Sequence, residues 1–198
     1  MKPVYSVVKM VEPEWEKVEA VSLTHTGWLK PCGVAARAQV CHNGEVLWVR
    51  LSAEEKTIRA TLTGMLDSVC KDSCLEFFFA PQRNDKRYFN FEFNPLGTMF
   101  LGFGGERETR VRQIPLHAEQ LFAPEPLVYE SGWEIVFRIP LTFVQMYFPE
   151  SSFSGEWRCN FYKCGELTEN PHYLAWAPLN TNMPDYHRWQ DFGILQFE

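Results

Sequence analysis

The sequence predicts an all-β fold in which two antiparallel sheets pack as a jelly-roll or immunoglobulin-like sandwich, with at most one or two short helices. Apolar and polar residues alternate along many short segments, which is the side-chain period of a β-strand. Turn-forming residues recur between these segments. Helical periodicity is scarce in the 198 residues. Roughly ten short strands with turns between them are typical of a sandwich.

The first two predicted strands form a hairpin. Residues 34–41 and 46–52 are strand-like segments on either side of the turn HNGE at 42–45. The Asn-Gly pair supplies the positive φ that a tight turn needs, so the two segments are expected to pair. Residues 52–63 begin like a helix capping box, but their β-branched side chains favour an extended continuation.

The central strands are rich in phenylalanine. Residues 74–80 form a compact apolar strand that ends at Pro81, and residues 88–94 alternate cleanly. One predicted face of the second strand carries Phe89, Phe91 and Phe93, and the other carries Tyr88, Asn90, Glu92 and Asn94. The sequence NPLG at 94–97 predicts a turn into the next strand, at 98–103.

The remaining elements follow the same pattern. Further strands are predicted at 133–139, 157–163, 172–176 and 193–197. A helix of about two turns is expected at 141–148, because Pro140 suits its first turn. We find no repeat, low-complexity tract or linker, so residues 1–198 are expected to form a single domain, with 1–27 as an N-terminal extension packed on it.

Composition excludes several classes of protein. The net charge is −6 and no long basic run occurs, which argues against nucleic acid or an anionic membrane as the main partner. No apolar stretch reaches the ~18 residues of a membrane helix. The first residues lack the apolar core of a signal peptide, so the default expectation is cytoplasmic, or extracellular if a longer precursor is exported.

The six cysteines are expected to be reduced and partly buried. Their C-x3-C and C-x4-C spacings, without a nearby histidine pair, make a poor zinc signature. They are also too sparse for a disulfide scaffold in a chain of this length. The cysteine spacing therefore predicts no metal site.

No nucleophile elbow, metalloprotease, P-loop or dinucleotide-binding motif is present. Glu76 and Glu92 lie on strands that are expected to be neighbours, and two carboxylates ~5 to 9 Å apart would satisfy a glycosidase. A deep cleft built from long loops is not expected in a chain this short, so a glycoside-acting enzyme remains the alternative to a binding protein.

Aromatic and polar side chains are concentrated in the C-terminal loop and on the polar faces of two strands. A sugar presents an apolar face and a belt of hydroxyls, so it requires rings and hydrogen-bonding groups together. Stacking is predicted for Trp176, Tyr186 and Trp189. Hydrogen bonding is predicted for Glu92, Asn94, Asn160, Asp185, His187 and Arg188.

Several segments resemble the family 9 carbohydrate-binding modules, and most closely a family 9-like branch of the DOMON-like β-sandwiches. The segments are DSCLEFFFAP at 72–81, YFNFEFNPLGT at 88–98, NFYKCG at 160–165, HYLAW at 172–176, PDYHR at 184–188 and DFGILQF at 191–197. The resemblance runs from about Trp28 to the C-terminus. It implies a non-catalytic module that binds plant-type polysaccharides such as xylan, with a glycoside hydrolase as a partner.

The resemblance also carries site residues. Asn94 matches a binding asparagine of the family, whereas Glu92 stands where family members have a binding arginine. One of two sandwiching rings falls near Tyr186 or His187. The other, a tryptophan, is expected just before Glu76, but residues 66–71 contain no aromatic side chain. The family's two-tryptophan clamp is therefore not expected here.

Related sandwiches also bind haem, so a haem or protein-interaction module is a further alternative. Its axial ligands would be exposed methionine or histidine side chains such as Met183 and His187. Isolated residues of these types are usually ordinary loop residues, so haem is disfavoured. No cofactor is expected, and a structural calcium is left open.

Overall fold

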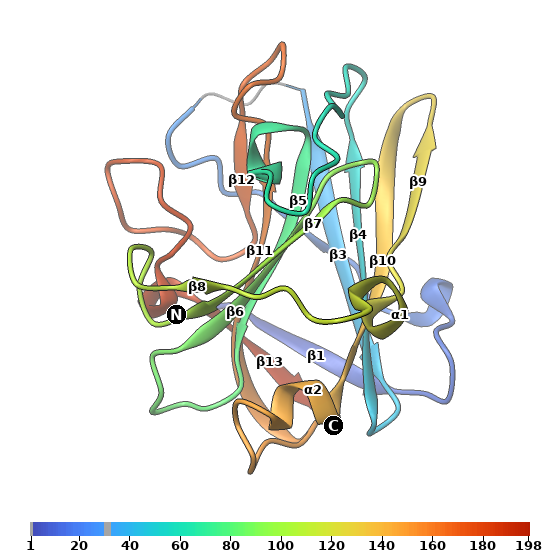
Figure 1. The fold of residues 1–198 in the computed structure, drawn as a ribbon, viewed down its shortest axis with the longest axis vertical. Helices are drawn as coiled ribbons and strands as arrows, with labels where there is room; N and C mark the ends of the chain where they lie inside the picture. Colours follow the sequence, from blue (N-terminus) through green and yellow to red (C-terminus); the bar gives the residue numbers. More distant parts are fainter. Residues whose placement is uncertain (1, 30–32) are drawn as a thin grey trace.

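β-Strands dominate the computed structural model, which describes residues 2–29 and 33–198 (Figure 1). The α-helices of this part of the chain are α1 (Ala118–Phe122) and α2 (Leu141–Gln145), and no described helix is long and apolar enough to cross a membrane. The strands are β1 (Val4–Lys9), β2 (Val21–Ser22), β3 (Ala35–His42), β4 (Val46–Glu54), β5 (Cys74–Ala80), β6 (Tyr88–Phe93), β7 (Met99–Gly104), β8 (Val111–Arg112), β9 (Glu125–Tyr129), β10 (Gly132–Pro140), β11 (Gly155–Cys164), β12 (Tyr173–Ala175) and β13 (Gly193–Phe197). The prediction of an all-β fold with two short helices is confirmed.

The strands form two layers that share β1. The first sheet has the order β8-β7-β6-β5-β11-β13-β1, with β12 beside β11. The second sheet has the order β1-β3-β4-β10-β9, with β2 beside β3. Figure 1 shows the strands of the second sheet on the right and those of the first crossing in front of them and to the left. The sandwich prediction is confirmed.

Aromatic side chains fill the space between the two sheets. The ring of Phe137 on β10 lies 5.7 Å from that of Phe91 and 4.6 Å from that of Phe93, both on β6. These residues are fully buried or nearly so. Burying a phenylalanine side chain contributes about 1.5–3 kcal/mol, so the Phe89/Phe91/Phe93 face predicted from the sequence is a major part of the core.

Strand β1 joins the two layers. Val4–Val7 pair in parallel with Ile194–Phe197 of β13, and Val8 and Lys9 pair in parallel with Cys41 and His42 of β3. The sequence analysis expects residues 1–27 to be an extension packed on the domain, whereas the structure places 4–9 within the sandwich as a strand. Six residues with a single clear alternation are too short a pattern to distinguish a strand from an extended tail.

Other differences have local causes. Residues 55–63 are irregular, because the carboxylate of Asp72 accepts hydrogen bonds from the backbone N–H groups of Thr61 and Leu62, 2.8 and 2.9 Å away, in place of a strand partner. Helix α2 is shorter than predicted. Strand β9 is exposed along its whole length, so its sequence lacks the alternation that identifies a half-buried strand.

A buried ionic network closes one end of the sandwich. The Lys163 ammonium on β11 lies 3.1 Å from Glu55 Oε2 and 2.8 Å from His172 Nε2. Ser73 Oγ and Trp133 Nε1 donate to the same Glu55 carboxylate, at 2.9 and 3.2 Å. Each charge in this network therefore has partners, which burial requires.

The network makes stability pH-dependent through His172. Burial and the neighbouring Lys163 charge lower the His172 pKa from 6.5 to about 4. Between these values the unfolded chain binds more protons than the folded one, so stability is present above pH 6.5 and falls as the pH drops towards 4, by about 2–3 kcal/mol. His187 shifts in the same direction.

Urea unfolding between pH 4 and 7 checks this prediction. The wild-type chain is expected to show a steeper loss of unfolding free energy on acidification than His172→Gln. The slope rather than the absolute stability is compared, because the substitution also removes packing. His117→Gln, at an exposed imidazole, is the matched control and is expected to keep the wild-type slope. Equal slopes for wild type and His172→Gln would contradict the assignment.

Candidate functional site

The outer face of the first sheet, turned away from the sandwich core, is covered by loops. Phe78, Tyr88 and Tyr162 project from this face and pack against Tyr186 and Phe192 of the C-terminal segment. The loop at 178–188 and the β7–β8 connection lie side by side at the left of Figure 1, and Arg107 Nη1 donates to the Pro184 carbonyl at 3.5 Å. The polar face of β6 is therefore buried, which the alternation alone did not show.

A small pocket remains open between these loops and the sheet. We call it the outer-sheet pocket. Its volume is about 120 Å³, room for roughly four water molecules at about 30 Å³ each. It is lined by Trp28, Cys70, Glu76, Glu92, Arg107, Arg110, Cys164, Glu166, Tyr173, Pro184, Asp185, Tyr186 and His187.

Two carboxylates form the floor of the outer-sheet pocket. Glu76 on β5 and Glu92 on β6 stand directly opposite each other in the antiparallel register. Their side chains are 2% and 4% exposed. Burial raises the pKa of Glu92 to about 7 and that of Glu76 well above its usual range, with the neighbouring Glu92 charge raising Glu76 further. Asn90 Nδ2 donates to Glu92 Oε1 at 2.8 Å.

Arginines from the β7–β8 connection form the rim. Arg107 Nη1 lies 3.8 Å from Asp185 Oδ1 on the opposite loop. Arg110 Nη1 donates to the Arg107 carbonyl at 3.1 Å, and its guanidinium lies 5.5 Å from the Phe100 ring. Arg110 Nε is buried without a hydrogen-bond partner among the described residues. The rim therefore presents positive groups above a floor of two buried carboxyl groups.

Aromatic rings form one wall. The Trp28 ring lies 5.5 Å from that of Tyr173 and 5.6 Å from that of Tyr186. Trp28 Nε1 donates to the Thr181 carbonyl at 2.9 Å, which ties the ring to the C-terminal loop. Tyr186 stacks on Tyr162 at 4.0 Å and donates its hydroxyl to the Lys163 carbonyl at 2.9 Å. These contacts hold the wall in place from both sides.

His187 is neutral in this arrangement. Its Nδ1 lies 2.8 Å from the Tyr88 hydroxyl, and its ring packs 5.1 Å from that of Phe78. Burial and the nearby charges of Arg110 and Arg107 lower the His187 pKa to about 2. The imidazole therefore offers hydrogen bonds but no charge at physiological pH.

The structure brings some of the predicted site residues together. Glu92, Asp185, Tyr186 and His187 all line the outer-sheet pocket. Arg188 and Trp189 lie outside it: Arg188 Nε is 3.3 Å from Asp191 Oδ2, and the Trp189 ring packs 5.0 Å from the guanidinium of Arg158.

The other predicted residues have structural partners instead. Asn94 is fully buried, and its Oδ1 accepts from the backbone N–H groups of Leu96 and Thr98. Asn160 is fully buried and bonds the backbone of Ala177 through both its Oδ1 and its Nδ2. Trp176 packs into the sandwich core, 5.6 Å from Phe161. These side chains present almost no surface to a ligand.

The sequence analysis missed the aromatic and basic residues that complete the pocket. Residues 66–71 contain no aromatic side chain, and Trp28 supplies the ring from a distant loop instead. The sequence feature that could have indicated Trp28 is its place beside Gly27 in a segment rich in turn-forming residues. Arg107 and Arg110 belong to a run with three arginines in six residues, 107–112, which was a second available signal.

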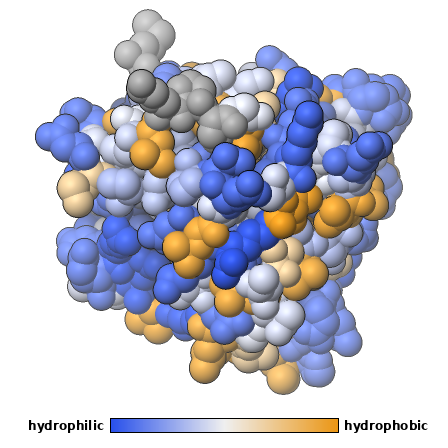
Figure 2. Space-filling model, turned by 90° about the horizontal axis from the view of Figure 1, so that it is seen from above, coloured by the Kyte–Doolittle hydropathy of each residue, from blue (hydrophilic) through white to orange (hydrophobic). Residues whose placement is uncertain are grey.

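A larger groove lies elsewhere. It has a volume of about 490 Å³ and is lined mainly by apolar side chains, including Met65, Leu96, Met99, Ile114 and Leu116. On the face seen in Figure 2, apolar residues form small groups among hydrophilic ones. This groove lacks the converging charged groups of the outer-sheet pocket. The smaller pocket is therefore the better candidate for a polar ligand.

Comparisons with known proteins agree on one family. The sequence profile of carbohydrate-binding family 9 matches residues 7–197. No curated protein matches the chain. A crystal structure of a candidate carbohydrate-binding protein from Bacteroides uniformis ATCC 8492 is 29% identical, with a TM-score of 0.85 and full coverage of both chains.

Two further structures share the fold at low identity. Both are of a family 9 carbohydrate-binding module from Caldicellulosiruptor kristjanssonii. The complex with cellotriose is 9% identical, with a TM-score of 0.69, and covers 99% of this chain and 94% of that one. The complex with glucose is 10% identical, with a TM-score of 0.65, and covers 99% of this chain and 96% of that one.

Proposed function

This chain belongs to carbohydrate-binding family 9, a family of non-catalytic modules, and from that membership we propose that it binds a saccharide in the outer-sheet pocket. The observation that carries the proposal is the convergence there of an aromatic wall, two rim arginines and two floor carboxylates. No other cavity described above combines these groups.

The pocket matches the chemistry of a sugar ring. The C–H face of the ring packs on Trp28 and Tyr173, and its hydroxyls accept from Arg107 and Arg110 and donate to Asp185 or Glu92. The volume of about 120 Å³ admits part of one sugar unit, with the rest of the ring outside the pocket, rather than a long segment. Asp185 already offsets the Arg107 charge at 3.8 Å, and the floor carboxyl groups would repel an anion when ionised, which favours a neutral sugar over a uronic acid.

The ligand we propose is a terminal unit of a neutral β-linked plant polysaccharide. The Caldicellulosiruptor complexes hold cellotriose and glucose, which support a glucan. Xylan, expected from the sequence, is the alternative. A glycoside hydrolase as a physical partner also stays a prediction.

Calorimetric titration with glucose, xylose, cellotriose and xylotriose tests the proposal. Wild-type protein is expected to bind a trisaccharide and the matching monosaccharide with similar affinity, because only one unit reaches the pocket. Trp28→Ala is expected to weaken binding about tenfold or more, equivalent to about 1.4 kcal/mol.

Trp15→Ala is the matched control, because Trp15 is partly exposed and does not line the pocket. It is expected to bind as wild type does. Unchanged affinity in Trp28→Ala, with the fold verified by circular dichroism, would place the sugar elsewhere. Absence of binding by the wild-type protein at millimolar sugar would overturn the proposed function.

A further inference from the structure

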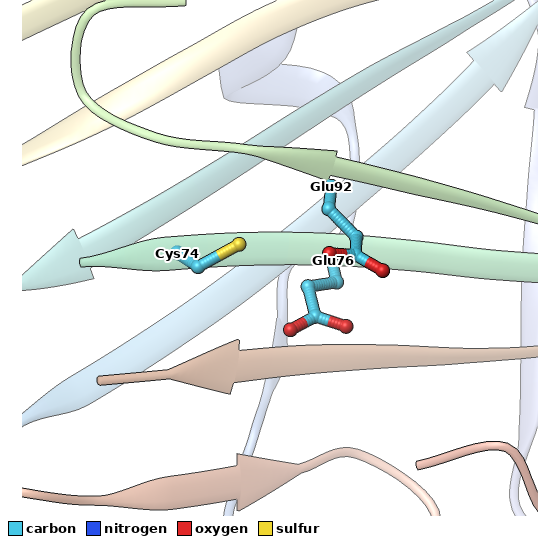
Figure 3. Close-up of side chains that lie close together, drawn as sticks. All are labelled: Cys74, Glu76 and Glu92. Carbon is cyan, nitrogen blue, oxygen red and sulfur yellow. The ribbon is translucent and has the colours of Figure 1, made fainter. Parts of the chain in front are cut away.

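Three buried metal-ligating side chains meet at the floor of the outer-sheet pocket. Cys74 and Glu76 lie two residues apart on the same face of β5, and Glu92 lies opposite Glu76 on β6. One donor atom from each lies within 4.8 Å of the others, and all three residues are buried. Figure 3 shows the Cys74 sulfur and both carboxylates converging.

The two carboxylates lack a cation partner. Neither forms an ion pair within 4.0 Å among the described residues; the more distant Arg110 charge partly offsets the rise in the pKa of both. The Lys163 ammonium, on the neighbouring strand, forms its ion pair with Glu55 and its hydrogen bond with His172 instead. Glu76 is only 2% exposed, and its side-chain hydrogen-bond partner among the described residues is the Cys74 thiol, a weak donor. Directly opposed carboxylates are unfavourable in a sheet unless a proton or a cation lies between them.

The thiol distinguishes a metal from a shared proton. A carboxylate pair that shares a proton needs no sulfur beside it, whereas Zn²⁺ binds sulfur and carboxylate oxygen readily. Two more thiols flank the cluster: Cys164 pairs in register with Cys74, and Cys70 lines the same pocket. This arrangement was invisible to cysteine spacing, because two of the three ligands are glutamates from different strands.

From this geometry we propose that Cys74, Glu76 and Glu92 bind one Zn²⁺ ion at the floor of the outer-sheet pocket. Ligand atoms around tetrahedral zinc lie about 3.5 Å apart. The donor atoms here lie within 4.8 Å of one another, so rotation of the glutamate side chains would bring them to the distance that zinc requires. The ion enters through the pocket, which both glutamates line. Binding requires all three ligands in their anionic forms, so the Cys74 thiol and each protonated glutamate release their protons to water. Water occupies the fourth position.

Metal titration of chelator-treated, full-length protein tests the proposal. Calorimetry is expected to show one equivalent of Zn²⁺ bound. The Co²⁺-substituted protein is expected to show a thiolate-to-cobalt charge-transfer band together with the visible bands of tetrahedral cobalt. Glu92→Gln is expected to lower the Zn²⁺ affinity by about 100-fold or more, since loss of a ligand exceeds loss of a supporting partner. Cys74→Ser is expected to abolish the charge-transfer band.

Cys41→Ser is the matched control, because Cys41 is an equally buried thiol on β3 in the other sheet. It is expected to keep both the stoichiometry and the band. No uptake by the wild-type protein, or a cobalt spectrum without a thiolate band, overturns the proposal without reference to any variant. Uptake that survives both Cys74→Ser and Glu92→Gln also overturns it.

Zinc binding and sugar binding can be tested separately. Trp28→Ala removes an aromatic ring from the wall and is expected to lose sugar affinity while it still binds one equivalent of Zn²⁺. Cys74→Ser is expected to lose the metal. Zinc binding without any sugar binding would therefore refute only the proposed function, and sugar binding without zinc would refute only this inference.

Discussion

Deletion of residues 1–10 is expected to leave a chain that does not fold cooperatively. Strand β1 occupies the position where the two sheets meet, with β13 on one side and β3 on the other. Its removal would expose backbone groups of both neighbours and empty the sites of Tyr5 and Val7, which are fully buried. The Tyr5 hydroxyl also accepts from the Val40 N–H at 2.9 Å and donates to the Glu19 carbonyl at 2.6 Å.

The expected loss is comparable with the whole stability of the protein. Truncation of one large core side chain costs about 3–5 kcal/mol, and a typical domain is stable by only about 5–15 kcal/mol. Thermal unfolding followed by circular dichroism provides the measurement. A chain lacking only residues 1 and 2 is the matched control, since it keeps Pro3, whose carbonyl accepts from the Ile194 N–H. A cooperative transition in the longer deletion would show that β1 is dispensable.

Lys163→Met is expected to destabilise the protein by about 3–5 kcal/mol, because it leaves the Glu55 carboxylate buried without its counter-ion. Methionine is similar to lysine in length, so lost packing contributes little. The same change also leaves His172 Nε2 without its 2.8 Å partner. Unfolding in urea at pH 7 measures the loss directly.

A double-mutant cycle separates charge from packing. In a Glu55→Gln background, Lys163→Met is expected to cost far less than in the wild type. The glutamine is neutral; its oxygen can still accept from Trp133 Nε1 while its amide nitrogen donates to Ser73 Oγ. Equal costs in both backgrounds would mean that the ion pair contributes nothing beyond the volume of the side chain.

The fold could be predicted from the sequence because several of its strands show a clear alternation of apolar and polar residues or end at a recognisable turn. The Asn43-Gly44 turn and the alternating phenylalanines of β6 each predict one local structure, and both are observed. Strands without such patterns were missed. Strand β9 is wholly exposed, and β1 owes its position to partners distant in sequence.

The site was less accessible, because polarity along a strand does not reveal what lies over it. Glu92 and Asn94 share a predicted face. Glu92 lines the pocket, whereas the Asn94 side chain accepts a hydrogen bond from the backbone of the following turn. Asn160 likewise satisfies backbone groups. Trp28 reaches the pocket from a loop that no local pattern connects to β5. Hydrogen bonds between distant segments decide these outcomes.

The parallel pairing of the first and last strands has a mechanical consequence. Val4–Val7 run alongside Ile194–Phe197 in the same direction, so the chain enters at one end of this pair and leaves at the other. Tension applied between the two termini therefore loads all the hydrogen bonds of the pair at once, in shear, instead of opening them singly as a zipper. A protein that is pulled by its two ends would therefore resist mechanical unfolding at the β1–β13 pair.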